Sequence, residues 1–97
     1  MFPQIETLLQ QIGAATAAGI AGEWNAAWIL VKVQTDVISV QGRVQAGAQV
    51  KSFLVSKQVI ALFKTLHTEM AQSEKIAWKS ARFDLQRSGK FDLKLQY

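Results

Sequence analysis

His67 is the only histidine of this chain, which has no cysteine, so few side chains are suited to catalysis or metal binding. Nucleophilic catalysis needs a hydroxyl or thiol beside a base, and zinc needs several His, Cys or carboxylate ligands. Glu69 is two positions from His67 and would lie on another side of a helix. Asp84 and Asp92 are surrounded by basic residues in a predicted hairpin. We therefore predict no catalytic residue, metal or cofactor, and a protein that is not an enzyme.

The net charge of +4 lies entirely in the C-terminal part of the chain. Residues 1–74 carry equal numbers of basic and acidic residues, whereas residues 75–97 carry six basic and two acidic residues. A field concentrated in this way attracts an acidic partner, although a solvated edge of the fold is the commoner explanation. The composition, 49% hydrophobic and 19% charged, is typical of a globular protein, and the length suits one domain spanning residues 1–97.

We expect no targeting segment in this sequence. The apolar run at residues 12–22 follows no basic stretch and is about half the length of a membrane span, which needs about 20 residues. The lack of cysteine is typical of a reducing compartment. We expect a cytoplasmic protein without membrane contact.

Helical and strand patterns alternate along the chain. Apolar residues recur at helical spacing in two segments and at every second position in the others. This order predicts an α+β fold, α-β-β-β-α-β-β, with a largely antiparallel sheet and both helices on one of its faces. The expected elements are helices at 3–20 and 56–72, strands at 27–34, 37–45 and 49–55, and a hairpin within 76–97. Ser56 is the expected cap of the second helix, and Trp24 and Trp28 are expected in the core.

The apolar faces also predict how two pairs of strands align. A two-residue turn at Thr35–Asp36 would pair Val33 with Ile38 and Val31 with Val40, keeping both apolar sets on one side. Thr-Asp is a weak sequence for so tight a turn, so a longer turn is an alternative.

The final hairpin has a register that its apolar residues determine. A two-residue turn would split the apolar face, because a shift of one residue moves every side chain to the other side. A three-residue turn, Arg87–Ser88–Gly89 with Gly89 in the left-handed conformation, pairs Leu85 with Phe91 and Phe83 with Leu93. The same register sets like charges opposite each other: Asp84 with Asp92, and Arg82 with Lys94.

The polar face of this hairpin is the predicted binding surface. Trp and Arg are the residue types that most often anchor protein interfaces. For Trp78, burial under a loop or the end of the second helix is an equally good alternative. The candidate partner-binding residues are Trp78, Arg82, Asp84, Lys90, Asp92 and Lys94.

Two stretches resemble a known family. They are Glu23-Trp24 before the first strand, and the closing run from Trp78 to Leu85 and from Ser88 to Tyr97. The tryptophan-led strand, the Gly-Lys-Phe turn and the terminal tyrosine are similar to those of YezG-type immunity proteins, which belong to bacterial polymorphic toxin and contact-dependent inhibition systems. The similar order of elements extends over nearly the whole chain.

This resemblance implies an antitoxin that binds the C-terminal domain of a cognate toxin, often a nuclease, and blocks it. The sequence itself leaves a monomer and a weak homodimer open, since the Ala-rich back of the first helix (Ala14, Ala17 and Ala18) is either an interface or plain surface. Members of that family tend to be acidic near the end, whereas this chain ends in a basic hairpin. Either the toxin presents an acidic surface, or the contact uses a patch around Glu23, Glu69 and Glu74. The alternative function is a small basic protein that binds single-stranded nucleic acid.

Overall fold

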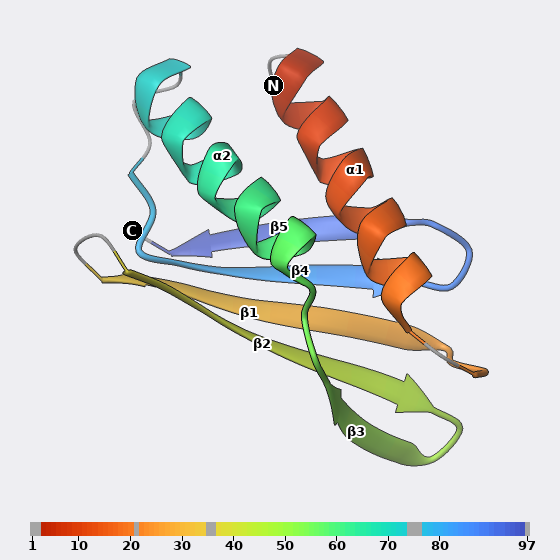
Figure 1. The fold of residues 1–97 in the computed structure, drawn as a ribbon. Coiled ribbons are helices and arrows are strands. Elements are labelled where there is room, and N and C mark those ends of the chain that lie inside the picture. Colours follow the sequence, from red (N-terminus) through yellow and green to blue (C-terminus); the bar gives the residue numbers. More distant parts are fainter. Residues whose placement is uncertain (1–2, 21, 35–36, 74–76, 97) are drawn as a thin grey trace.

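A computed structural model of the chain describes residues 3–20, 22–34, 37–73 and 77–96. Within these residues, two helices lie on one face of a five-stranded antiparallel sheet, which confirms the predicted α+β fold and the order of its elements (Figure 1). The elements are α1 (Pro3–Gly19), β1 (Ala26–Gln34), β2 (Val37–Ala46), β3 (Gln49–Phe53), α2 (Lys57–Ser73), β4 (Ser80–Gln86) and β5 (Phe91–Gln96).

The strand order in the sheet is β3-β2-β1-β4-β5, so β1 is central and β3 and β5 are the two edges. Strands β1, β2 and β3 form a local meander and β4 and β5 a hairpin, but the pairing of β1 with β4 joins segments that are distant in the sequence. The two helices lie side by side above the sheet (Figure 1). Neither helix in the described part of the chain is long and apolar enough to span a bilayer.

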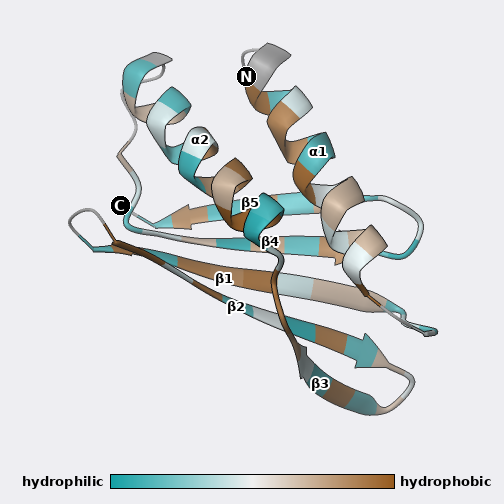
Figure 2. Cartoon of the chain, viewed as in Figure 1, coloured by the Kyte–Doolittle hydropathy of each residue, from teal (hydrophilic) through white to brown (hydrophobic). Residues whose placement is uncertain are grey.

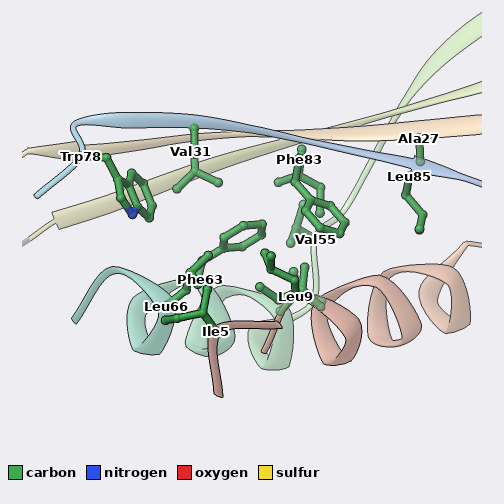
Figure 3. Packing of buried hydrophobic residues seen from close by; sticks show 14 of the residues in the cluster. Ile5, Leu9, Ala27, Val31, Val55, Phe63, Leu66, Trp78, Phe83 and Leu85 are labelled. Atoms are coloured by element: carbon green, nitrogen blue, oxygen red, sulfur yellow. The ribbon is translucent and has the colours of Figure 1, made fainter. Parts of the chain in front are cut away.

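The core lies between the helices and the sheet face beneath them, where the apolar stripes of both helices face the strands (Figures 2 and 3). Phe63 of α2 meets Phe83 of β4 edge to face, with ring centroids 6.1 Å apart, a geometry that aromatic pairs prefer. Ser56 caps α2 as predicted, since its Oγ accepts a hydrogen bond of 3.2 Å from the Val59 N–H. The buried side chains include Ile5, Leu9, Ile12, Trp24, Ala27, Ile29, Val31, Val59, Phe63, Leu66, Met70, Ala81, Phe83 and Leu85.

Both predicted registers are confirmed. Val33 pairs with Ile38 and Val31 with Val40, although the Thr35–Asp36 turn itself lies outside the described residues. In the last hairpin, Leu85 pairs with Phe91 and Phe83 with Leu93, and Gly89 has a φ of 99°. A glycine supplies this left-handed conformation without steric cost. Two like-charged pairs therefore do face each other: Asp84 with Asp92, and Arg82 with Lys94.

Two expectations about the strands need correction. The third strand ends at Phe53, two residues earlier than predicted, because the chain leaves the sheet there to reach α2. Trp28 does not belong to the core. It is half-buried on the sheet face opposite the helices, because side chains alternate along β1 and the adjacent Ala27 and Ile29 take the buried side.

Asn25, just before β1, connects the β2–β3 and β4–β5 turns to the start of the central strand. Its side-chain Oδ1 accepts a 2.7 Å hydrogen bond from the Gly47 N–H, and its carbonyl accepts one of 3.1 Å from the Arg87 N–H. We expect Asn25→Ala to lower the free energy of unfolding by about 1 kcal/mol, because the Gly47 N–H loses its partner. Urea denaturation would measure this. Asn25→Asp, which keeps the acceptor, should stay close to wild type, and equal losses in both variants would contradict the assignment.

Candidate binding surface

The sheet face opposite the helices, here called the open face, is covered by no helix or strand in the described residues (Figure 1). Its side chains are those that alternate with the buried ones in every strand, so the registers bring the open-face residues of β1, β2, β4 and β5 into rows. The aromatic and charged side chains of the open face are Trp28, Lys32, Arg43, Arg82, Asp84, Asp92 and Lys94.

A shallow groove of about 320 Å³ crosses this face over β1, β4 and β5. Leu30 contributes an apolar side chain to its lining and is 37% exposed, which is unusual for a leucine on a central strand. Lys32, Arg82 and Lys94 place three basic side chains around it, of which Arg82 forms an ion pair with Asp84 outside the lining. Because like charges are gathered there, the groove attracts anionic groups.

Arg82 is held in position by two contacts. Its Nε donates hydrogen bonds of 3.0 and 3.2 Å to the two carboxylate oxygens of Asp84. Its guanidinium carbon lies 5.2 Å from the centroid of the Trp28 ring, within the range of a cation–π contact. An exposed ion pair adds little stability, so the main effect of Asp84 is to keep the guanidinium over the indole and beside the groove.

Trp78 is not part of this surface, and its assignment there was wrong. The residue is 1% exposed and lies before β4, under the C-terminal half of α2. His67 meets the indole edge to face at 4.8 Å, and its Nε2 donates a 3.0 Å hydrogen bond to the Trp78 carbonyl. The prediction extended the two-residue alternation of β4 backwards beyond Ser80, where the strand begins and the alternation no longer applies.

The other candidate residues are distributed unevenly. Arg82, Asp84, Asp92 and Lys94 lie together on the open face, as their register requires. Lys90 is exposed in the β4–β5 turn, at the opposite end of the hairpin from the groove residues Ser80 and Gln96.

The acidic patch considered as an alternative does not form among the described residues. Glu23 precedes the start of β1, which lies beside the end of β4. Glu69 lies on α2 near His67, whose partner Trp78 precedes the start of β4. The two carboxylates are therefore at opposite ends of the sheet, and Glu74 lies outside the described residues.

Sequence reasoning missed three residues of the open face: Trp28, Lys32 and Arg43. The alternation in β1 placed Trp28 and Lys32 on one face, but nothing local indicated that β4 would lie beside them. Arg43 projects from β2 and its Nη1 donates a 2.6 Å hydrogen bond to Ser52 Oγ on β3. The pairing of β1 with β4 is what joins both halves of the cationic surface.

The chemistry available on this face is recognition of anionic groups beside an apolar contact. Within the described ranges, no group of three or more His, Asp or Glu side chains is placed to hold a metal ion. Comparison with protein families finds no family that matches this chain, and comparison with curated proteins finds no matching sequence.

Proposed function

We propose that this chain is an immunity protein that binds and neutralises a cognate bacterial toxin domain through the open face of its sheet. The observation that carries the proposal is the groove with three cations and an exposed leucine on a face that the protein's own described elements leave free. The resemblance of the Glu23-Trp24 segment and the closing hairpin to YezG-type immunity proteins supplies the class of partner.

The open face has the composition of an interface centre. Protein interfaces are anchored by aromatic and arginine side chains, surrounded by a polar rim. Here Trp28 and Arg82 lie beside Leu30 on adjacent central strands, where the sheet holds them rigidly. A preorganised surface loses little side-chain freedom on binding. The basic groove further implies that the toxin contributes carboxylates at the contact. An acidic immunity protein would instead recognise a basic toxin surface.

Single-stranded nucleic acid is less well matched to the same face. Proteins that bind it without sequence preference stack bases on exposed aromatic rings along a basic channel. Trp28 is the only aromatic residue of the open face in the described strands, and the Arg82 guanidinium already lies over its ring. The face therefore offers phosphate contacts without a free stacking platform, which favours a protein partner.

Reversing one groove charge should test the proposal. We expect Lys32→Glu to weaken binding to the toxic domain encoded by the adjacent reading frame by about ten-fold or more, because a carboxylate would then face the toxin's own carboxylates. Isothermal titration calorimetry measures the affinity, and co-expression with the toxic domain measures protection.

Lys64→Glu is the matched control, since it makes the same charge change on an exposed residue of α2. Equal affinities of the two variants would remove the open face as the binding site. Failure of the wild-type protein to bind the toxic domain, together with oligonucleotide binding that falls steeply as salt rises, would replace the immunity proposal with the nucleic-acid alternative.

A further inference from the structure

The outer edge of β5 is an unpaired strand edge with unusual self-complementarity. β5 is the last strand of the sheet on its side, and no other strand in the described part of the chain pairs with its outer edge (Figure 1). Natural proteins protect such edges with proline, a bulge, very short strands or charged side chains, and β5 carries only the last of these, Asp92 and Lys94. The sequence of β5, Phe-Asp-Leu-Lys-Leu-Gln, contains no proline or glycine.

The direction of the free main-chain groups follows from the bonds to β4. Gln86 N–H donates to the Lys90 carbonyl at 2.8 Å, and Lys79 N–H donates to the Gln96 carbonyl at 2.7 Å. Even-numbered residues of β5 therefore direct their main-chain groups towards β4. Because these directions alternate in an antiparallel ladder, Phe91, Leu93 and Leu95 direct their N–H and C=O groups outwards, to the open edge.

We propose that this edge pairs with the same edge of a second copy of the chain, so that one antiparallel sheet runs through a symmetric dimer. A two-fold axis at Leu93 places Leu93 opposite its own copy and Phe91 opposite the second copy's Leu95. All of these residues direct their main-chain groups outwards, so each opposed pair exchanges two main-chain hydrogen bonds. An isologous contact of this kind closes as a dimer and leaves no further edge of β5 exposed.

The charges select this register. With the axis at Leu93, Asp92 lies opposite the second copy's Lys94, and Lys94 lies opposite the second copy's Asp92. The two neighbouring registers that keep the same hydrogen-bonding directions set Asp92 against Asp92 or Lys94 against Lys94, and like charges directly across a sheet are unfavourable. β3, the other edge, has Lys51 as its only charged residue and carries no such complementarity.

The dimer also corrects an unfavourable feature of the single chain. Within one chain, Asp84 faces Asp92 and Arg82 faces Lys94, so each cross-strand pair carries like charges. In the dimer, the row that begins with Asp84 and Asp92 continues into the second copy's Lys94 and Arg82. Each like-charged pair thus meets a pair of opposite charge, which adds to the relief that the Arg82–Asp84 ion pair already provides within one chain.

The partial burial of the apolar side chains of β5 also favours a second copy as the partner. Phe91, Leu93 and Leu95 are only partly buried, whereas the β4 residues beside them, Ala81, Phe83 and Leu85, are buried. The second copy would bring the same three apolar side chains alongside, with leucine against leucine at the axis. The open face of each chain stays uncovered, and Lys32 lies on β1, two strands away from the edge.

Sedimentation equilibrium of the wild-type chain and two charge variants tests the pairing. We expect the wild type to associate into dimers between about 1 µM and about 1 mM, the range in which small interfaces dissociate. Asp92→Lys and Lys94→Asp should each raise the dimer dissociation constant by about ten-fold or more, because both cross-axis pairs then carry like charges. Mixed in equal amounts, the two variants should form a heterodimer at least as tight as the wild-type dimer, since opposite charges again face each other.

Unfolding cannot account for the loss of association in these variants, because each substitution replaces a like-charged pair with β4 by an opposite-charged one. Thermal melts at a concentration where the wild type is monomeric should therefore show both variants to be at least as stable as the wild type, since dimer formation at higher concentrations would itself raise the wild-type melting temperature. A wild-type chain that stays monomeric throughout the range, single variants that dimerise as tightly as the wild type, or a mixture that does not associate would each overturn the proposal. None of these outcomes affects the toxin-binding test on Lys32.

Discussion

Replacing Trp78 with alanine should lower the free energy of unfolding by about 3–5 kcal/mol, the usual effect of truncating a buried aromatic side chain. The indole is 1% exposed and points from the sheet layer towards α2 (Figure 3). Its removal would leave a cavity below the helix and take away the edge-to-face contact with His67, whose ring centroid lies 4.8 Å from that of the indole. Equilibrium denaturation with urea, followed by circular dichroism, gives the measurement.

Two further variants separate packing from binding at this position. Trp78→Phe should cost clearly less than Trp78→Ala, because it retains a ring and removes an indole N–H that has no hydrogen-bond partner among the described residues. Arg82→Ala, on the open face, should leave stability within about 1 kcal/mol of the wild type. If Trp78→Ala were as stable as the wild type yet bound the toxic domain poorly, Trp78 would belong to the surface and its buried placement would be contradicted.

Gly42→Ala should lower the free energy of unfolding by about 1–3 kcal/mol through overpacking. Gly42 lies in β2 between Ile29 of β1 and Phe53 of β3, and it is buried under the Phe53 ring. A Cβ at this position would come within 2.8 Å of two carbon atoms of that ring. Real side chains do not approach so closely, so the ring would have to leave its place over the sheet.

The matched control for Gly42 is Gly19→Ala at the end of α1, where an added Cβ meets nothing within 4 Å. This control should be neutral or slightly stabilising, because alanine is the better helix former. The double variant Gly42→Ala/Phe53→Ala should lose less free energy of unfolding than the two single variants together, since the ring that clashes is gone. Strictly additive losses would show that the Phe53 contact is not the cause.

Local patterns predicted most of this fold. The alternation of Phe83, Leu85, Phe91 and Leu93 was enough to reject a two-residue turn and to identify Gly89 as the left-handed residue, and the structure confirms both. The helical spacing of the apolar residues in α2 and the Ser56 cap were predicted equally well from the sequence. These features depend on residues that are close in the sequence, where side-chain direction follows directly from backbone geometry.

The candidate site was predicted only in part. Arg82, Asp84, Asp92 and Lys94 were placed on one surface correctly because a single hairpin contains them all. Trp78 was misplaced because it precedes the strand whose alternation was applied to it. The groove was not foreseen, since Leu30 and Lys32 reach it from a strand that is distant in the sequence.

The sequence by itself determined the order of elements, the hairpin registers and the concentration of positive charge in the last segment, because each depends on local spacing and composition. Only the tertiary structure decided that β4 pairs with β1, and so that the basic hairpin and the first strand form one surface. The physical reason is that pairing between distant strands is selected by how the whole apolar face is buried beneath both helices. The pairing of β4 with β1 therefore depends on the packed core as a whole and cannot be deduced from any single segment.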